Sequence, residues 1–239
     1  MTTNMFDYRG LQDGFFIALY IGAAFIALMA CLYLLLRRIN AVAGDVTSSL
    51  RLRRWTAGLM VAIAASHVWW YGVGVWWLAD DWLVRTIIVI MLDYVTLVPL
   101  TMTVLLCMLQ DRRRPLWPWL VMQVPVVVAA VVGIAQRSTF WGFEMTHYWQ
   151  LFVIAVLITY YIYGLWRYGR WLRNNYADLD SKEVWQSLVF AVGLLVVYVI
   201  YTSNAGELMR EYLSQVITLV IIAFLVWRVE TLQGLEESG

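Results

Sequence analysis

Two ionisable side chains, His67 and Asp93, fall inside long apolar stretches of this 239-residue sequence. A carboxylate near the middle of a bilayer costs at least about 2.5–3.5 kcal/mol, so it normally faces the protein interior and has a polar partner. If both residues lie in membrane-crossing helices, they share a similar depth, which makes His67 the expected partner of Asp93 and Arg85 the next. The pair predicts a ligand anchor or proton-sensitive switch, or else a hydrogen bond that merely joins two helices.

Aromatic and polar residues surround these two at helical spacing. Trp70 and Tyr71 follow His67 at i+3 and i+4, so the three share one helix face. The residues that predict a ligand-binding pocket in the outer half of the membrane are His67, Trp70, Tyr71, Asp93, Tyr94, Tyr198, Tyr201 and Gln215. Asp93 and His67 would anchor the ligand, the rings would form the walls, and Gln215 would couple the ligand to the last helix. The inner halves contain mainly Leu, Val, Ile and Ala, which predicts a pocket sealed from below. A simpler alternative is that the rings gather there because the membrane interface does.

Seven apolar runs must position these residues. They cover roughly residues 14–36, 55–78, 85–110, 115–135, 149–166, 184–203 and 212–227. Each approaches or exceeds the roughly 20 residues that cross a hydrocarbon core. No alternating strand pattern appears, so the fold class is an all-α membrane protein, a seven-transmembrane-helix bundle over residues 1–233. Pro99 and Pro125 lie deep enough in their runs to kink the helices, and Pro115 and Pro118 open the fourth.

Basic residues indicate the orientation of this bundle. One set of alternate gaps holds Arg37, Arg38, Arg51, Arg53, Arg54, Arg112, Arg113, Arg114, Arg167, Arg170, Arg173, Lys182 and Arg228, while the other holds only Arg9, Arg85, Arg137 and Arg210. The positive-inside rule then predicts the N-terminus outside and the C-terminus in the cytoplasm. We expect a multi-pass protein of the bacterial inner (cytoplasmic) membrane, with the lipid bilayer as its surroundings.

Signatures of other functions are scarce. No cluster with metal-ligand spacing and no recognisable catalytic triad occurs, so we expect no enzyme activity, no metal and no cofactor. Cys31 and Cys107 fall in the inner halves of apolar runs, where a disulfide is not expected. The first run follows an acid-containing stretch rather than a basic one and lacks a cleavage site, so it is expected to be a retained helix and not a signal peptide.

The third apolar run resembles that of the microbial rhodopsins. It reads Arg85, then Asp93-Tyr94-Val95-Thr96-Leu97-Val98-Pro99, and that family places an acidic counter-ion six residues before a proline. The family also carries retinal on a lysine of the seventh helix, whereas the single lysine of this chain, Lys182, falls in a loop. The resemblance therefore implies a rhodopsin-like architecture without covalently bound retinal.

Two later segments resemble the membrane portion of regulatory proteins of the Bacteroidota. They are the loop from Arg173 to Ser187, with Asn174-Asn175-Tyr176-Ala177-Asp178-Leu179-Asp180, and the tail from Phe224 to Gln233. Those regulators carry a multi-helix membrane region followed by a cytoplasmic AraC-like helix-turn-helix domain, or in relatives a kinase module. The resemblance implies that residues 234–239 begin a cytoplasmic output region. Nucleic acid would then be bound only through that further domain, and a homodimer is possible.

These observations predict a transmembrane sensory domain that detects a small or lipidic ligand and passes the signal through the last helix. A seven-helix transporter of small solutes is the main alternative. Transporters often contain internal repeats, and none is evident between the first three and the last three helices. A rhodopsin-like protein without bound retinal is the second alternative.

Overall fold

The computed structural model describes residues 14–37, 40–73, 81–110, 113–175, 184–190, 192–193 and 207–235, with side chains of the last segment from residue 212. These residues form helices and loops, and no strand occurs among them. The helices are α1 (Gly14–Leu36), α2 (Leu50–Tyr71), α3 (Trp82–Met108), α4 (Trp117–Val121), α5 (Val124–Gln136), the π-helix η3 (Phe140–Met145), α6 (Thr146–Asn175) and α8 (Glu207–Thr231). Residues 185–190 are also helical. The expected all-helical fold is confirmed for this part of the chain.

Within the described part of the chain, five helical segments are long and apolar enough to cross a membrane. They are Gly14–Leu36, Trp82–Met108, Trp117–Gln136, Phe140–Asn175 and Tyr212–Thr231, and each corresponds to one predicted run. The helix α2 is not among them, because arginines open it and His67 with two tryptophans closes it. The predicted run 184–203 lies mostly outside the described residues.

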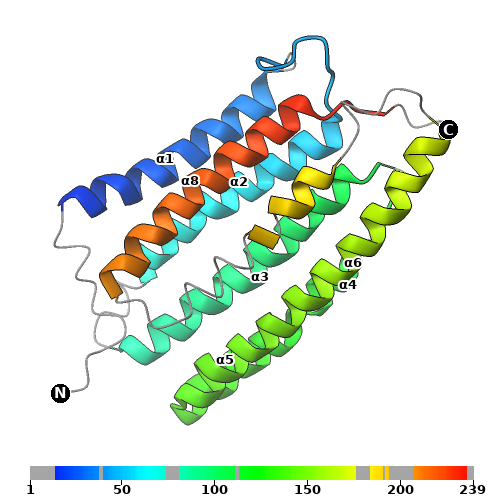
Figure 1. Ribbon diagram of the computed structural model, residues 1–239. Helices are drawn as coiled ribbons and strands as arrows, with labels where there is room; N and C mark the ends of the chain where they lie inside the picture. The colour runs from blue at the N-terminus through cyan, green and yellow to red at the C-terminus, as the bar shows by residue number, and fades with distance from the viewer. Residues whose placement is uncertain are drawn as a thin grey trace.

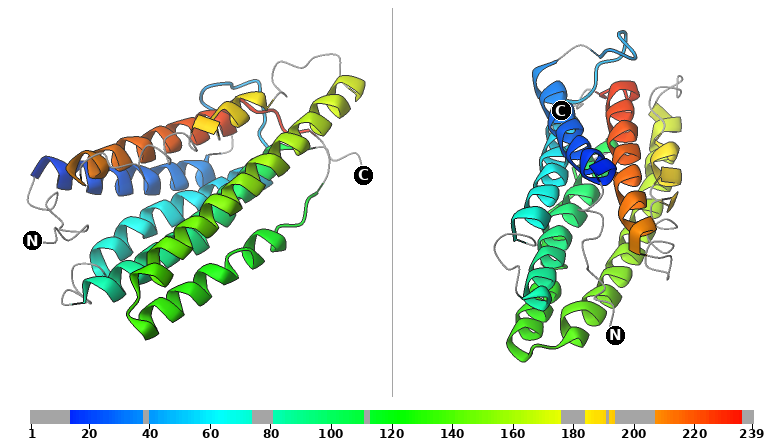
Figure 2. Two further views of the ribbon diagram at one scale, coloured as in Figure 1. Left: turned by 60° about the horizontal axis from the view of Figure 1, so that its bottom comes forward. Right: turned by 90° about the vertical axis from the view of Figure 1, so that its left-hand side faces the viewer.

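The helix α2 is the centre of one half of the molecule. It packs against α1, α3 and α8, and α1 also contacts α8 (Figure 1). On the other side of α3, the segments α5, η3 and α6 form a hairpin whose members contact one another and α3 (Figure 2). The third helix thus joins the α1–α2–α8 group to the hairpin.

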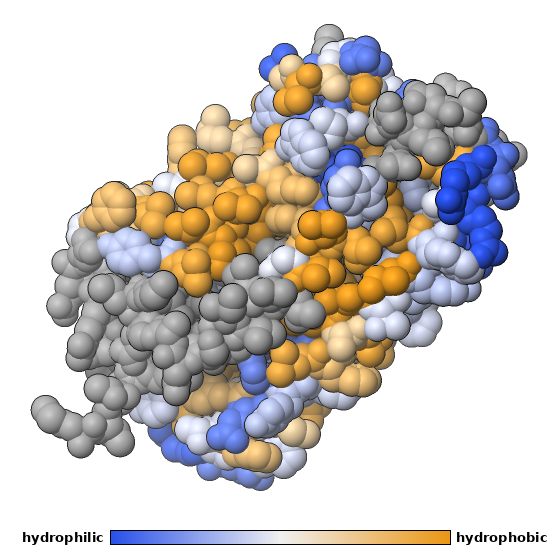
Figure 3. Space-filling view, viewed as in Figure 1, coloured by the Kyte–Doolittle hydropathy of each residue, from blue (hydrophilic) through white to orange (hydrophobic). Residues whose placement is uncertain are grey.

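One end of the bundle collects the arginine-rich helix ends. The C-terminal ends of α1, α6 and α8 lie there together with the N-terminal end of α2 (Figure 1). We call this the inner end and the opposite one the outer end. In Figure 3 apolar residues dominate the middle of the visible face, and strongly hydrophilic ones gather toward the ends. The sequence pattern of alternate basic gaps is therefore matched in space by one basic end.

The helix α6 shows how the bundle divides into buried and exposed faces. Its buried residues recur every three or four positions, as expected of a helix that packs on one side. They are Thr146, Gln150, Val153, Leu157, Tyr161, Gly164, Tyr168 and Leu172. Tyr161 and Tyr168 are among the largest fully buried side chains, and both belong to the main hydrophobic core. This core anchors α6 toward the inner half of the bundle.

Two glycines allow the hairpin to pack closely at the outer end. A Cβ atom built on Gly133 of α5 would lie 2.7 Å from the backbone nitrogen of Gly142 in η3. A Cβ on Gly142 would lie 2.3 Å from Cδ1 of Ile87 in α3. Because the Gly133 contact is with backbone atoms, α5 and η3 can approach this closely only with glycine at position 133. A side chain at position 142 would require Ile87 of α3 to move.

A break divides the fourth apolar run. Pro125 has no N–H and its ring clashes with the carbonyl four residues earlier in a regular helix, so a helix that reaches this position is kinked or broken. The chain accordingly ends α4 at Val121 and begins α5 at Val124. The helix is therefore broken at Pro125 rather than only kinked. Pro118 lies in the first turn of α4 as expected, whereas Pro115 precedes the helix. Pro99 lies inside α3, which remains one helix from Trp82 to Met108.

Candidate functional site

Asp93 of α3 is held by three side chains of α2. The hydroxyl of Ser66 donates to Oδ1 at 2.7 Å and the indole N–H of Trp69 donates to the same oxygen at 2.9 Å. The indole N–H of Trp70 donates to Oδ2 at 2.7 Å. A carboxylate offers about four acceptor sites. Three are filled by neutral donors, so the acid is accommodated within the bundle through hydrogen bonds from one neighbouring helix.

The sequence of α2 explains this arrangement. Ser66, Trp69 and Trp70 stand at i, i+3 and i+4, which places them on one face of the helix. Their donors therefore converge on one point of α3. The two adjacent indoles reach the carboxylate from different directions and contact different oxygens. We call Ser66, Trp69, Trp70 and Asp93 the carboxylate clamp.

His67 points to a different neighbour. Its Nε2 lies 2.9 Å from Oε1 of Gln215 in α8, and its Nδ1 lies 2.8 Å from the backbone carbonyl of Ile63. Both partners are oxygens, and only an imidazolium has an N–H on each ring nitrogen to donate to both. If the side-chain amide of Gln215 is turned over, its NH2 group faces Nε2, and a neutral ring satisfies both contacts. His67 and Gln215 are buried, with 8% and 7% of their surface exposed. One side-chain hydrogen bond thus joins α2 to α8 in the outer half.

A tyrosine of α1 completes the surroundings of His67. The hydroxyl of Tyr20 donates to the backbone carbonyl of His67 at 2.6 Å, and the two rings lie 4.6 Å apart. The helix α2 therefore makes polar contacts with α1, α3 and α8 within two turns. The outer-half cluster consists of the carboxylate clamp together with Tyr20, His67 and Gln215.

The expected hydrogen bond between His67 and Asp93 is wrong. The ring nitrogens of His67 contact Ile63 and Gln215, and the described hydrogen bonds of Asp93 come from Ser66, Trp69 and Trp70. The physical reason is rotation about the helix axis. Adjacent residues point about 100° apart on a helix, so Ser66 faces α3 while His67 faces α8.

The other predicted pocket residues have mixed positions. Trp70 belongs to the clamp and Gln215 to the contact with His67, as described above. Tyr94 follows Asp93 in α3 and is half-buried, whereas Tyr71 is 45% exposed at the end of α2. Tyr198 and Tyr201 lie outside the described residues.

Three residues of the outer-half cluster were missed from the sequence: Tyr20, Ser66 and Trp69. The signal for two of them was present, because Ser66, Trp69 and Trp70 carry three hydrogen-bond donors at i, i+3 and i+4. Tryptophans near helix ends are common at the membrane interface, so Trp69 by itself does not indicate a contact with a carboxylate. Tyr20 has no such local pattern.

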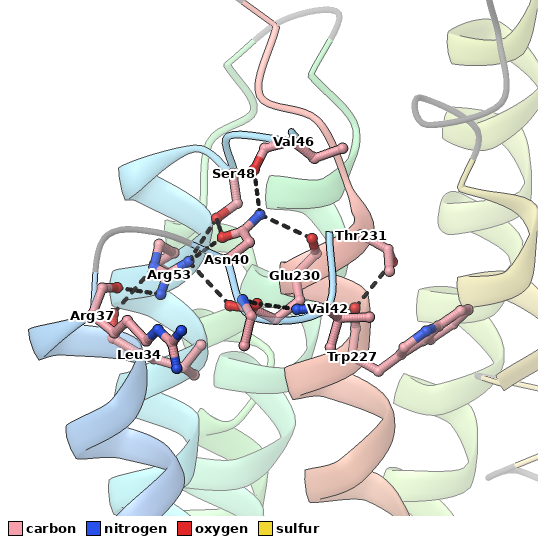
Figure 4. A network of polar contacts seen from close by, with 11 residues as sticks. Leu34, Arg37, Asn40, Val42, Val46, Ser48, Arg53, Trp227, Glu230 and Thr231 are labelled. Carbon is pink, nitrogen blue, oxygen red and sulfur yellow. Dashed lines mark hydrogen bonds and ion pairs between the residues drawn. The ribbon is translucent and has the colours of Figure 1, made fainter. Parts of the chain in front are cut away.

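A second polar cluster lies at the inner end, where the sequence indicated basic residues but no buried ion pair (Figure 4). Arg53 of α2 and Glu230 of α8 form an ion pair with Nη1 and Oε1 3.4 Å apart, and the side chains are 4% and 1% exposed. Arg53 also donates to the Asn40 side chain at 2.8 Å and to the carbonyl of Leu34 at 3.2 Å. It further contacts the carbonyl of Arg37. The guanidinium is thus almost fully satisfied inside the protein.

Glu230 ties α8 to the connection between α1 and α2. Its Oε2 accepts hydrogen bonds from the backbone N–H groups of Ala41 and Val42 (Figure 4). The side-chain amide of Asn40 donates to the carbonyl of Glu230 at 2.9 Å and to that of Val46 at 2.6 Å. We call Asn40, Arg53 and Glu230 the inner-end cluster. It fixes the C-terminal part of α8 against α1 and α2.

The chain that follows α8 is held by further hydrogen bonds. The N–H of Gly234 donates to the carbonyl of Thr47 at 2.7 Å. The side chain of Gln110, after α3, donates to the carbonyl of Gln233 at 2.9 Å and accepts from the N–H of Leu235 at 2.7 Å. The path of the chain as it leaves α8 is therefore set by two loops.

The break between α4 and α5 is bridged from α6. The indole N–H of Trp149 donates to the carbonyl of Met122 at 2.8 Å, and the amide of Gln150 donates to that of Gln123 at 2.6 Å. Gln123 and Gln150 are 2% and 0% exposed. The remaining amide atoms, Nε2 of Gln123 and Oε1 of Gln150, have no hydrogen-bond partner. Side chains of the next helix thus replace part of the bonding that the break removes.

Among the described residues, no group of three or more His, Cys, Asp or Glu side chains could hold a metal ion. Cys31 and Cys107 are free and buried. Comparison of the chain with models of protein families, with curated proteins and with solved structures finds no match. The function must therefore be argued from the two polar clusters and the helices that join them.

Proposed function

We propose that the chain is a transmembrane sensory domain that passes a signal from the outer-half cluster to the inner end through α8. The observation that carries the proposal is that α8 makes a buried polar contact with α2 at both ends. Gln215 contacts His67 and, about 22 Å further along the helix, Glu230 contacts Arg53. A ligand that opens the outer contact would let α8 move relative to α2 about its contact at the inner end.

The proposed ligand is a small or lipidic molecule bound in the outer half. Its surroundings would include His67, Trp70, Asp93, Tyr94 and Gln215, with the rings as packing surfaces. Tyr71, Tyr198 and Tyr201 would complete the wall. A ligand shifts a receptor only through its different affinity for two states. A molecule with a hydrogen-bond donor or acceptor would achieve this by competing for Gln215 or His67.

The proposed topology has seven spans, with the N-terminus outside and the C-terminus in the cytoplasm of a bacterial cell. Two observations support it: the arginine-rich helix ends share the inner end, and α2 lies between helices of spanning length. Two fusions to Gly239 test the orientation. One carries a fluorescent protein that matures only in the cytoplasm, and the other carries an alkaline phosphatase that is active only outside it. Fluorescence without phosphatase activity is expected, and the reverse pattern would contradict the topology.

The sensory function predicts that outer-half substitutions change an inner-end output. We would join the chain at Gly239 to a DNA-binding module that is active only as a dimer, and measure reporter expression at equal membrane abundance. Asp93→Asn and Gln215→Ala are expected to change expression. Val216→Ala is a matched control, because Val216 adjoins Gln215 but is 48% exposed. Unchanged expression in both outer-half variants would refute the proposed anchor and coupling.

Transport of a small solute is the second candidate, favoured by the break between α4 and α5. Transporters often bind substrates at discontinuous helices, and the Gln123–Gln150 pair supplies buried polar groups at this break. Proteoliposomes loaded with radiolabelled amino acids or sugars would test this candidate. Uptake that Gln150→Leu abolishes would favour transport over sensing.

A further inference from the structure

One face of α6 remains uncovered along the whole helix. Between and opposite the buried residues named above, the exposed positions of α6 are Tyr148, Phe152, Ala155, Thr159, Ile162, Tyr163, Trp166, Arg167, Arg170, Arg173, Asn174 and Asn175. Large apolar side chains on this face are strongly exposed, with Phe152 at 53% and Tyr163 at 55%. Since α6 belongs to a segment able to cross a membrane, this face is the one that meets lipid.

Aromatic rings occur toward both ends of this face, whose exposed apolar surface continues outward from Tyr148 through Met145 to Phe140. Tyr148 is 63% exposed near the outer end, and Trp166 is 57% exposed toward the inner end. The helix between them rises about 27 Å, close to the roughly 30 Å of a hydrocarbon core. Tyrosine and tryptophan are enriched at the two membrane interfaces. The spacing therefore places Trp166 at the inner boundary between hydrocarbon and headgroups.

Beyond Trp166 the same helix becomes cationic. Arg167, Arg170 and Arg173 are all exposed, and α6 continues to Asn175. At about 1.5 Å per residue they lie roughly 2–10 Å past the indole, which is the depth of the phosphate groups. Three positive charges thus stand at headgroup level on the lipid-facing side of the bundle.

Trp166 also orients one of these arginines. The guanidinium carbon of Arg170 lies 3.8 Å from the centroid of the Trp166 ring, which is a cation–π stack. Arg173 is held along the helix by a hydrogen bond from its Nε to the carbonyl of Gly169 at 3.3 Å. Stacking leaves the edge of the Arg170 guanidinium available, and that edge matches a phosphate group in a bidentate arrangement.

We propose that Trp166, Arg167, Arg170 and Arg173 form a binding site for the phosphate headgroup of an anionic phospholipid. The occupant follows from position and charge, because the site lies on a lipid-facing helix at headgroup depth and is positive. This proposal does not depend on the sensory function. It assigns α6, which lies on the far side of α3 from the α1–α2–α8 group, the role of holding the bundle against the anionic leaflet.

The test compares lipid selectivity of the whole chain in bilayers of phosphatidylcholine. Electron spin resonance of spin-labelled phosphatidylglycerol and of spin-labelled phosphatidylcholine gives the relative affinity of each lipid for the protein surface. Loss of one arginine near a membrane surface weakens its attraction roughly fivefold. Replacing Arg167, Arg170 and Arg173 by Gln is therefore expected to lower the preference for phosphatidylglycerol at least fivefold.

The matched control removes the same charge elsewhere at the inner end, by replacing the exposed Arg37, Arg51 and Arg54 with Gln. An equal loss in this control, or an unchanged preference in the α6 variant, would overturn the site. Should the triple Gln variant not fold, replacement of the same three residues by Lys keeps the charge but removes the stack. An intermediate preference is then expected, and a parental one would contradict the role of the guanidinium groups. Competition by dissolved inorganic phosphate would assign the site to free phosphate and refute the lipid assignment.

Discussion

The ion pair between Arg53 and Glu230 gives the sharpest quantitative prediction. At 3.4 Å and an effective dielectric constant of about 20, the Coulomb attraction is about 5 kcal/mol. Arg53→Met removes it and leaves a buried carboxylate without its cation. The backbone N–H groups of Ala41 and Val42 still bind that carboxylate and offset part of the loss. We expect the free energy of unfolding to fall by about 3–5 kcal/mol, the usual cost of removing one partner from a buried pair.

The measurement is reversible unfolding by SDS in mixed micelles, followed by far-UV circular dichroism. Arg54→Met is the control, since Arg54 is the next residue of α2 and is exposed. It should change the free energy of unfolding by about 0.5 kcal/mol or less. This comparison separates the buried ion pair from a general effect of positive charge at the start of α2.

A double variant tests the physical reason. If the cost of Arg53→Met comes from an uncompensated Glu230 carboxylate, then Arg53→Met combined with Glu230→Met should cost less than the sum of the two single changes. Additive costs would refute the reasoning, as would an Arg53→Met variant as stable as Arg54→Met.

Three further predictions use the same unfolding measurement. Asp93→Asn should cost about 1–3 kcal/mol, because the new amide places N–H groups against an indole N–H such as that of Trp70; stability equal to the parent would contradict the clamp. Gly142→Ala should lower the free energy of unfolding by about 1–3 kcal/mol through overpacking. Gly169→Ala is the control, because its added Cβ has nothing within 4 Å, and it should be neutral or stabilising by up to about 1 kcal/mol. Equal changes in the two variants would contradict the close approach of α3 and η3. Trp149→Phe keeps a six-membered aromatic ring but removes the pyrrole part of the indole with its N–H donor. A loss of at least about 0.5–1.5 kcal/mol is expected from the hydrogen bond at the α4–α5 break, and no loss would mean that another donor replaces it.

The existence of most helices could be predicted from sequence because apolar runs and arginine positions are strong signals in a membrane protein. Their ends could not. The predicted run 149–166 stops where polar residues begin, yet α6 continues to Asn175. Backbone hydrogen bonding in a helix does not depend on hydropathy, so a helix can leave the hydrocarbon core without ending. The lipid-facing arginines of α6 are a direct result.

The outer-half cluster could be predicted only in part. The positions of His67 and Asp93 along their helices correctly predicted that the two residues lie at a similar depth. Depth, however, gives no information about the direction in which a side chain points around the helix axis. Rotation decides that His67 meets Gln215 while Ser66 meets Asp93. Two residues adjacent in sequence therefore contact different helices, and a pattern along one helix cannot assign the partner.

The inner-end cluster had no local signal at all. Asn40 and Glu230 are separated by 190 positions and meet through a side-chain to backbone hydrogen bond. Glu230 lies between Arg228 and Thr231, in a segment whose sequence is typical of a polar helix end. Only the three-dimensional arrangement of α1, α2 and α8 shows that the carboxylate is buried.

The two contacts between α2 and α8 also decide which end of α8 would move first. The segments that join them are nearly equal in length, because Arg53 to His67 spans about 21 Å of α2 and Gln215 to Glu230 spans about 22 Å of α8. Because both contacts join the same two helices, sliding or turning one helix against the other strains both contacts. The outer hydrogen bond contributes about 0.5–1.5 kcal/mol, whereas breaking the inner pair costs about 3–5 kcal/mol. A ligand with a modest preference for the open state can therefore release the outer contact while the inner one holds. In the proposed sensory function, α8 would then pivot about Glu230 and pass its motion to the Gly234–Leu235 segment.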